Sequence, residues 1–374
     1  MRKLRIGQIA PLNVPIPPKK YGGVERIVDT LCRGLSENGH KIFLFAAADA
    51  KTTKGQIIPI TPKSLCTNEI REATPYYSYG MAVVAKEARR LKLDIIHDHV
   101  GPFSLALYGC LNIPIIHTLH VPMNIHRAWA YQKLNSNLIS ISNNQRKVAP
   151  RLNYVATVYN GTDTNLFQFS LNPRDYFLFL GELAERKGVR EAIAVAKQLK
   201  LKLLIAGRIP LQIPSQIKDY IFFQKYVKPE LSHERIKYVG EVTSKEASKL
   251  YGNARATLFP ISWEEPFGLV MTESMSCGTP VIAFACGSVP EVIRDGETGF
   301  IINPSDKDIR GNWIIKKSGM DGFLKAVKQI YNMPSSEYQN MCRNCRKHIE
   351  RKFSIKRMID EYEKVYYEVV KNGR

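Results

Sequence analysis

The chain has 374 residues, of which 44% are hydrophobic and 24% are charged. This composition is that of an ordinary globular protein; it excludes wholesale disorder, collagen and coiled coil, and the length favours two domains. Lysine and arginine number 54 against 34 aspartates and glutamates, and the resulting net charge of +20 indicates an anionic partner (nucleic acid, acidic lipid or acidic substrate) or a solvated basic surface.

Two further features bear on where the protein works. No apolar run reaches the ~18 residues that span a bilayer, and Gly7-Gln8 and Pro11 interrupt the apolar stretch behind the basic start. Seven cysteines are scattered along the chain, an odd number that does not suggest a disulfide framework. We therefore expect a cytoplasmic protein without a signal peptide, which could associate peripherally with the cytoplasmic face of the membrane.

The first half of the chain alternates short apolar runs with helical patterns. The apolar spacing from Val24 to Leu35 predicts a helix that ends at Asn38-Gly39. Strands are predicted at residues 4–10, 41–47, 94–97, 114–119, 137–141 and 154–158. This rhythm of strand and helix predicts a mostly parallel sheet covered by helices.

A second alternating series follows the turn residues at 158–161. Strands are predicted at 176–180, 201–206, 236–239, 256–259, 280–283 and 299–301, and helices at 188–199, 245–251 and 269–277. Three long helices are predicted at the end of the chain, at roughly 320–331, 336–350 and 355–371. The fold class is therefore α/β with two doubly wound domains, whose ligands lie at the carboxyl ends of the strands.

Two glycines, Gly22 and Gly23, directly precede the first predicted helix. Glycine lets backbone N–H groups approach an anion, and a helix N-terminus adds a partial positive charge. The pair therefore indicates either a phosphate site or a plain helix-entry turn. It is not a P-loop, because no GxxxxGK[ST] is present.

Histidines gather at the ends of two predicted strands. We interpret His97-Asp98-His99 as one histidine facing the ligand and one hydrogen-bonded to backbone, with a metal site as the remote alternative. His120 ends the next strand and should face the ligand. His117 lies inside that strand and is predicted to be a core histidine with its polar atoms satisfied.

The most specific stretch runs from Trp263 to Glu273, between a strand and a helix. Glu265 lies in the loop, where its carboxylate could accept hydrogen bonds from sugar hydroxyls. Residues 267–269 offer backbone N–H groups at the helix start, and Glu273 lies about one turn further on, within reach of a ribose diol. Two carboxylates eight residues apart could also be a glycosidase pair, but nothing in the sequence fixes their separation.

Taken together, the motifs resemble those of retaining glycosyltransferases of family 4, which have the GT-B fold. Glu265 to Glu273 matches the E-x7-E signature, and residues 21–26 resemble the N-terminal glycine motif. The remaining matches follow in the family's order at 160–167, 181–188, 204–207, 277–283, 287–291 and 296–300. The resemblance implies a GT-B architecture, in which two doubly wound Rossmann-like domains face a central cleft.

The resemblance also implies a division of labour. Residues 1–157 would form the acceptor-binding domain, onto which the C-terminal helix 355–374 would pack back, and residues 158–354 would bind the nucleotide sugar. Loops at 11–21, 60–80 and 121–130 would meet the acceptor.

Carried over onto the matching positions, the resemblance implies a set of site residues. Catalytic roles fall on His120 beside the transferred sugar, Lys187 at the leaving diphosphate and Glu265 at the hydroxyls of the donor sugar. The implied donor-binding positions, which take the diphosphate, the ribose and the border of the base, are Gly22, Gly23, Val242, Phe267, Gly268, Leu269 and Glu273.

The sequence departs from the family at Glu182, where members usually carry an arginine that is paired with the lysine. Losing one of two diphosphate cations could cost roughly 1.5–3 kcal/mol. Arg186 and Arg208 are near in sequence or motif, and we expect them to substitute as donor-binding residues. A weakened or non-catalytic relative is the other possibility.

We therefore predict a retaining, metal-independent glycosyltransferase that moves a hexosyl unit from a nucleotide-diphosphate sugar to an acceptor hydroxyl. The acceptor is a lipid-linked, polysaccharide or small molecule, and an anionic membrane surface is a further expected partner. We expect no cofactor and no metal, since Asp306-Lys307-Asp308, the one DxD-like pattern, reads as a polar surface turn. The donor base is not indicated by any side chain, although UDP is favoured.

Two alternatives stay open. Another GT-B enzyme, such as a sugar-nucleotide epimerase or a phosphorylase, would share the architecture. A basic nucleic-acid-binding protein is the remote alternative; the charge suggests it, but no RNP, KH or zinc-finger pattern supports it.

Overall fold

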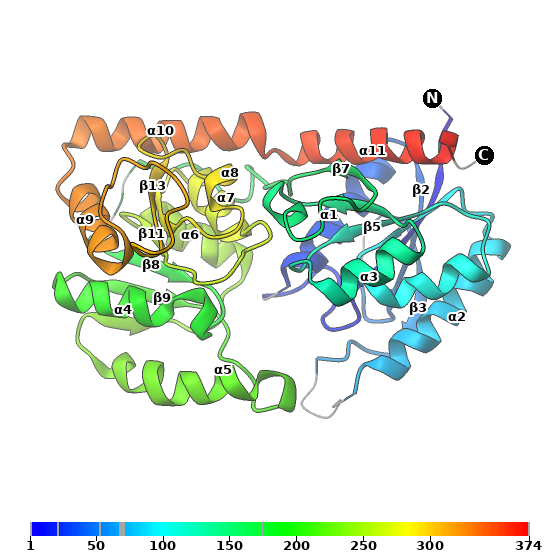
Figure 1. Ribbon diagram of the computed structural model, residues 1–374, viewed down its shortest axis with the longest axis horizontal. Coiled ribbons are helices and arrows are strands. Elements are labelled where there is room, and N and C mark those ends of the chain that lie inside the picture. The colour runs from blue at the N-terminus through cyan, green and yellow to red at the C-terminus, as the bar shows by residue number, and fades with distance from the viewer. Residues whose placement is uncertain are drawn as a thin grey trace. The chain divides into compact units, whose positions relative to one another are not determined.

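The computed structural model describes residues 2–20, 22–51, 54–66, 72–171, 173 and 175–372. The chain divides into two compact units (Figure 1). Unit 1 comprises residues 1–161 and 355–374, and unit 2 comprises residues 162–354. The chain therefore leaves unit 1 once and returns to it with its last helix.

Unit 1 is built on a seven-stranded, all-parallel sheet. Its strands are β1 (Arg5–Ile9), β2 (Lys41–Ala47), β3 (Gln56–Thr61), β4 (Ile95–Asp98), β5 (Ile115–Leu119), β6 (Asn137–Ser140) and β7 (Tyr154–Thr157). They lie in the order β3-β2-β1-β4-β5-β6-β7. The strand numbers fall from β3 to β1 and then rise from β4, so the switch point lies between the parallel neighbours β1 and β4. Its helices are α1 (Gly23–Glu37), α2 (Thr74–Arg90), α3 (Ile125–Lys133) and α11 (Ile355–Asn372), together with the 3-10 helix η1 (Pro102–Gly109).

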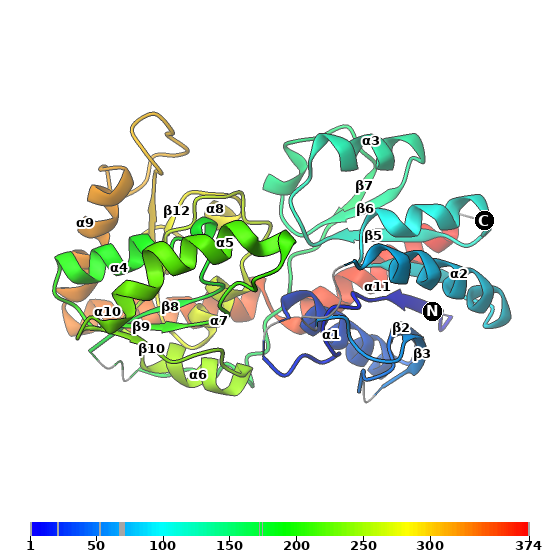
Figure 2. The ribbon, with the colours of Figure 1, turned by 90° about the horizontal axis from the view of Figure 1, so that it is seen from below.

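Helices cover unit 1's sheet because its strands are apolar on both faces. Phe43, Phe45 and Ile96 are fully buried in a cluster that includes Met81 and Val84 of α2. Helix α1 packs against α11, whose apolar stripe is buried, and Figure 2 shows these two helices side by side.

Unit 2 repeats the pattern with a six-stranded, all-parallel sheet. Its strands are β8 (Phe177–Leu180), β9 (Leu203–Ala206), β10 (Ile236–Tyr238), β11 (Thr257–Phe259), β12 (Val281–Phe284) and β13 (Gly299–Ile302), in the order β10-β9-β8-β11-β12-β13. Its helices are α4 (Val189–Gln198), α5 (Ile217–Phe222), α6 (Ser244–Asn253), α7 (Leu269–Ser276), α8 (Val289–Val292), α9 (Gly319–Tyr331) and α10 (Ser335–Lys352). The strand order reverses between β8 and β11, the second switch point of the molecule.

The fold class expected from the sequence is confirmed, since both sheets are parallel and doubly wound. Most strands differ from the predicted ranges by a residue or two. Strand β3 was missed, because Pro59 in its middle argues against a strand. The structure tolerates the proline because β3 is an edge strand, which among the described residues pairs with β2 alone. None of the helices in the described ranges is long and apolar enough to cross a membrane.

Candidate active site

The switch point of unit 2 brings together a lysine and a carboxylate. Lys187 lies in the loop after β8, and Glu265 lies in the loop after the neighbouring strand β11. Nζ of Lys187 is 2.6 Å from Oε2 of Glu265, and the Glu265 side chain is largely buried. A parallel sheet places its ligands where two such loops diverge, so this pair marks the candidate donor site.

Glycines allow the two loops to approach this closely. Gly188 has φ +78°, and a Cβ on it would lie 2.0 Å from the carbonyl oxygen of Pro260. Gly287 has φ +60°, and a Cβ there would lie 2.2 Å from the Glu265 backbone nitrogen. Since no side chain fits at either place, Gly188 lets the Lys187 loop approach the loop after β11, and Gly287 lets the loop after β12 approach Glu265.

Trp263 completes this pair. Its indole Nε1–H donates to Oε2 of Glu265 at 2.9 Å, and the Lys187 ammonium lies 4.5 Å from the centroid of its ring. One carboxylate oxygen therefore accepts from both an indole and an ammonium. The Lys187 ammonium also lies over the face of the Trp263 ring, which is a cation–π contact.

A compact ionic cluster surrounds position 182, where members of the resembled family usually carry an arginine. Glu182 is 5% exposed; its Oε1 lies 2.6 Å from Nη2 of Arg208, and its other oxygen pairs with Arg186. Arg186 also binds Asp219 of α5 at 2.5 Å. Burial lowers the pKa of Arg186, but the charges of Glu182 and Asp219 outweigh this and raise it. Arg186 and Arg208 are thus both held by Glu182.

Helix α7 begins directly after the Glu265 loop. Phe267 is buried against Phe353 with ring centroids 5.8 Å apart, and Gly268 (φ +77°) is the residue before the helix. Leu269 is the first helical residue. Since the first N–H groups of a helix have no intrahelical partner, the start of α7 at Leu269 is suited to an anion.

Glu273 and Val242 sit deeper in the unit. Glu273 is buried in α7, where its Oε2 accepts from the hydroxyl of Tyr251 at 3.3 Å. Val242 is half-buried and packs against the apolar cluster that contains Tyr251. Gly207 N–H donates to the Gly240 carbonyl at 2.9 Å, so the loops after β9 and β10 run side by side near these residues.

Unit 1 carries the other predicted site residues. Gly22 (φ +140°) precedes α1, which begins at Gly23, and a Cβ on Gly22 would lie 2.7 Å from Pro18. The first residue of the expected glycine motif, Tyr21, lies outside the described residues. The glycine pair thus occupies the helix-entry position after β1, which borders the switch point of this sheet.

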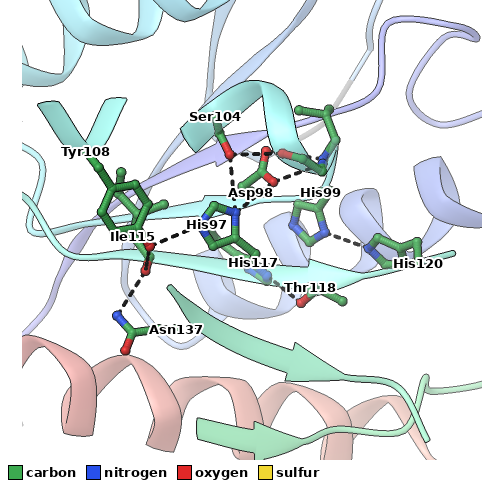
Figure 3. A network of polar contacts seen from close by, with 12 residues as sticks. His97, Asp98, His99, Ser104, Tyr108, Ile115, His117, Thr118, His120 and Asn137 are labelled. Carbon is green, nitrogen blue, oxygen red and sulfur yellow. Dashed lines mark hydrogen bonds and ion pairs between the residues drawn. The ribbon is translucent and has the colours of Figure 1, made fainter. Parts of the chain in front are cut away.

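His120 is joined to His99 at the neighbouring strand end. Nδ1 of His99 lies 2.9 Å from Nε2 of His120, and the two rings stack (Figure 3). The interpretation of residues 97–99 was wrong in one respect, because among the described residues neither the His97 nor the His99 imidazole binds a backbone group. His97 contacts the hydroxyls of Tyr366 and Thr118 instead, and in this triplet it is Asp98 that accepts from backbone N–H groups.

The prediction for His117 is confirmed. It is fully buried, with Nδ1 3.1 Å from Oδ2 of Asp98 and Nε2 3.1 Å from the Tyr108 hydroxyl (Figure 3). Asp306 and Asp308 form an exposed polar turn as expected, where Asp308 pairs with Arg310. Within the described residues, no group of three or more His, Cys, Asp or Glu is arranged to hold a metal.

Of the predicted residues, Arg186, Lys187, Arg208 and Glu265 lie in one region of unit 2, while Gly22, Gly23 and His120 belong to unit 1. Sequence reasoning missed Trp263 as a partner of Glu265, although it stands two residues away. It also missed Asp219, Gln8 and Tyr366, which are far from their partners along the chain and leave no local signal.

Two all-parallel doubly wound sheets, each with polar side chains at its switch point, define an α/β protein of the GT-B type. Residues 21–166 match the family model described as Glycosyltransferase Family 4, and residues 163–317 match that of glycosyl transferases group 1. The chain belongs to the family 4 glycosyltransferases, as its motifs predicted, and it is a glycosyltransferase of the GT-B type.

Known proteins resemble the chain over nearly its whole length. It is 24% identical to N-acetyl-alpha-D-glucosaminyl L-malate synthase of Bacillus anthracis, over 94% of this chain and 96% of that protein. Sucrose-phosphate synthase of Thermosynechococcus elongatus superposes with a TM-score of 0.80 at 18% identity, covering 99% of this chain and 100% of that one. Anabaena Alr3699/HepE in complex with UDP-glucose gives a TM-score of 0.74 at 16% identity, covering 98% and 100%. At these identities the two structures establish the fold.

Proposed function

We propose that the protein transfers a hexosyl unit from a nucleotide-diphosphate sugar to an acceptor hydroxyl, with retention at the anomeric carbon and without a metal ion or a cofactor. The observation that carries the proposal is the Lys187–Glu265 pair at the switch point of unit 2. The ammonium is suited to the leaving diphosphate, and the carboxylate is suited to hydroxyls of the sugar.

The leaving group requires positive charge as the glycosidic bond breaks. Lys187 supplies a full charge, and the N-terminus of α7 at Gly268 and Leu269 supplies backbone N–H donors and a helix dipole. In this proposal Glu273 binds the ribose, and Arg208 and Arg186, oriented by Glu182, stand beside the diphosphate in place of the family arginine. Anabaena Alr3699/HepE, which was solved in complex with UDP-glucose, supports a UDP sugar as the donor here.

No side chain of the proposed site stands out as a covalent nucleophile, so we favour substitution on one face of the sugar. The acceptor oxygen forms its bond to the anomeric carbon on the face from which the diphosphate leaves. The bond from that carbon to the phosphate oxygen breaks with its electron pair going to the diphosphate, and the acceptor's proton passes to a diphosphate oxygen. Gly22, Gly23 and His120 keep the roles implied by the resemblance, toward the diphosphate and the transferred sugar.

The charge distribution of unit 1 favours an acceptor carried by an anionic membrane. Between Asp98 and Asp163 the chain holds no aspartate or glutamate. Within this stretch, Ile125 and Trp129 lie one turn apart on α3 and are 72% and 64% exposed. Exposed apolar side chains beside cations are typical of helices that lie in a membrane interface, and Lys133 on α3 is an exposed cation of this kind.

Binding of nucleoside diphosphates tests the donor proposal. We expect UDP, GDP or ADP, added in EDTA at about 100 times its dissociation constant, to stabilise the fold by about 2.7 kcal/mol in a thermal-shift measurement. Lys187→Met should abolish the shift. A shift that needs added Mg²⁺ would contradict metal independence, and no shift with any diphosphate would contradict the donor class. The anomeric configuration of the product, read by NMR, tests retention.

Vesicle sedimentation tests the membrane proposal. We expect the protein to bind phosphatidylcholine vesicles that contain phosphatidylglycerol and to leave pure phosphatidylcholine vesicles in solution. Ile125→Ser with Trp129→Ser should weaken binding by at least about tenfold. The matched control is Ile309→Ser, since Ile309 is 64% exposed but is flanked by Asp308 and Arg310. Equal binding to both vesicle types would contradict the proposal.

A further inference from the structure

A chain of hydrogen bonds connects His120 to the C-terminal helix α11. Nδ1 of His99 lies 2.9 Å from Nε2 of His120, and Nε2 of His99 lies 2.8 Å from Oε1 of Gln8. Nε2 of Gln8 lies 3.1 Å from the hydroxyl of Tyr366, which lies 2.7 Å from Nδ1 of His97. Figure 3 shows the three histidines at the ends of their strands.

The members of this chain are fixed by the sheet and shielded from water. Gln8 of β1 stands opposite His97 of β4 in the parallel register, and both are fully buried. Tyr366 is also fully buried, and His99 is nearly so. Because water cannot substitute for a missing partner here, each hydrogen must point at the next member of the chain.

The three histidines are neutral near pH 7. Burial, with the neighbouring histidines, holds the pKa of His97 and of His99 well below the usual range. Burial lowers the pKa of His120 to about 4. Each ring therefore has one N–H and one lone pair, and the only freedom left is which nitrogen carries the hydrogen.

The direction of the hydrogens follows from the carboxamide of Gln8. Its Oε1 can only accept, so Nε2 of His99 carries the hydrogen and Nδ1 of His99 is a lone pair. Nε2 of His120 must then be the donor to His99. At the other end, the Gln8 amide donates to the oxygen of Tyr366, whose own hydrogen goes to Nδ1 of His97.

We propose that Tyr366 and His99 are positioning residues that hold the His120 imidazole in the tautomer with its hydrogen on Nε2, so that its Nδ1 presents an acceptor to the substrate. Within the described residues, Nδ1 of His120 has no hydrogen-bond partner. The C-terminal helix thus helps to set, through Gln8 and His99, the hydrogen-bonding character of a residue far from it in sequence.

Tyr366 has this influence because the hydrogen bonds can reverse direction only if its hydroxyl exchanges its donor and acceptor roles. If Gln8 were turned over, its amide would donate to Nε2 of His99, and His120 would instead carry its hydrogen on Nδ1. Tyr366 would then have to donate to Gln8 and accept from His97. The chain continues from His97 through Thr118 at 2.7 Å to the hydroxyl of Tyr362 on α11 at 3.0 Å, so α11 anchors it twice.

The consequence for the substrate rests on the proposed function. A neutral His120 with a lone pair on Nδ1 accepts from a hydroxyl of the transferred sugar and cannot donate to a phosphate oxygen. It therefore discriminates in favour of a hydroxyl at the position it faces. A donor with fluorine or hydrogen at that position would lose the interaction.

The test is the nitrogen spectrum of the histidines in the full chain. In protein labelled with ¹⁵N at histidine, two-bond ¹H–¹⁵N spectra distinguish an Nε2–H ring from an Nδ1–H ring, and His120→Gln assigns the signal. We expect His120 to be of the Nε2–H type at pH 7. In Tyr366→Phe, which removes the hydroxyl but keeps the ring, the His120 signal should shift toward the Nδ1–H type.

Controls separate positioning from general loss of structure. Tyr108→Phe removes a hydroxyl that binds His117 in the same sheet but lies outside the chain, so it should leave the His120 signal unchanged. Gln8→Met breaks the chain at its centre and gives the same readout as Tyr366→Phe where that variant does not fold. With a nucleotide sugar, Tyr366→Phe should lower kcat/KM by about two- to tenfold and leave binding of the nucleoside diphosphate alone unchanged.

An Nδ1–H ring on His120 in the unaltered protein would overturn the proposal. A His120 signal that is unchanged in both Tyr366→Phe and Gln8→Met would overturn it as well. The spectra need no substrate. If they come out as expected while no nucleotide sugar is turned over, the proposed function fails and the positioning chain stands.

Discussion

Nζ of Lys187 and Oε2 of Glu265 lie 2.6 Å apart in loops that follow two adjacent strands of one sheet, β8 and β11. Each member of the pair thus neutralises the charge of the other. A diphosphate that takes the ammonium would release the carboxylate toward a sugar hydroxyl. The two halves of a nucleotide sugar would therefore be bound by groups that are kept in place by each other beforehand.

Replacing the ammonium should disable turnover without unfolding the protein. Lys187→Met keeps most of the aliphatic stem but loses the ammonium, which lies over the Trp263 ring and which we propose faces the leaving diphosphate. We expect kcat to fall by about 10²–10³-fold, the effect of removing one preorganised electrostatic group. Steady-state kinetics with the nucleotide sugar identified by thermal shift would measure it.

Lys197→Met is the matched control. Lys197 pairs with Glu230 at 2.7 Å, but both side chains are substantially exposed, and exposed pairs contribute little. Its kcat should equal that of the unaltered protein. Equal losses in Lys187→Met and Lys197→Met would show that the charge at 187 has no special role.

Restoring the family arginine at position 182 should harm this protein. Glu182→Arg would place a third guanidinium against Arg186 and Arg208, which the buried carboxylate now holds. Leaving like charges unpaired in such a place costs about 3–5 kcal/mol. We expect a loss of that size in the free energy of unfolding, measured in urea, together with loss of turnover.

A charge exchange should recover part of that loss. Glu182→Arg combined with Arg208→Glu restores one opposite pair, so the double variant should be more stable than Glu182→Arg alone. If the effects of the two substitutions on the free energy of unfolding simply add, Glu182 and Arg208 are not coupled, and the ionic cluster does not determine the geometry of this loop.

The stability of unit 1 should fall as the pH drops below about 6.5. The folded-state pKa of His97 and of His99 is well below that of an unfolded histidine, near 6.5, and that of His120 is about 4. Between these values the unfolded chain binds more protons than the folded one. Each such histidine therefore lowers the free energy of unfolding by up to about 1.4 kcal/mol per pH unit as the pH falls. Its full contribution to stability is present above pH 6.5.

Hydrogen exchange of the β4 and β5 amides between pH 7 and 5.5 would measure this, since exposed carboxylates barely titrate there. His99→Gln removes one titrating group, so the free energy of unfolding should depend less steeply on pH in this variant. His126→Gln, at an exposed position of α3, should not. A slope that is the same in all three proteins would mean that the buried histidines do not govern acid stability.

Much of the fold was predictable because the responsible signals are local. Runs such as Lys41–Ala47 and the apolar spacing of α1 directly encode a buried strand and an amphipathic helix. Strand β3 escaped because Pro59 weakens the local signal, and its edge position, which makes the proline harmless, is a property of the sheet. Helix α5 lies in a stretch for which no local pattern predicted an element.

The site was predictable only where it follows the chain. Residues 263–273 carry loop and helix in one segment, so Glu265 and the start of α7 could be assigned together. That Glu182 binds Arg208 could not be read from either residue, because the contact joins loops after two strands. The bond between Gln8 and Tyr366 spans almost the whole sequence, and its formation depends on the return of α11 to unit 1.

That return can be tested where α11 meets α1. A Cβ on Gly34 of α1 would lie 1.9 Å from Cδ1 of Ile359, so in Gly34→Ala either the Ile359 side chain or the two helices must shift. Alanine favours a helix by about 1 kcal/mol, but overpacking costs about 1–3 kcal/mol, and we expect unit 1 to lose stability on balance. Gly109→Ala, where nothing lies within 4 Å of the added carbon, should be close to neutral. Ile359→Ala removes the clashing methyl groups, so Gly34→Ala should cost less in that background than in the unaltered chain. An equal cost in both backgrounds would place the strain elsewhere than at the α1–α11 contact.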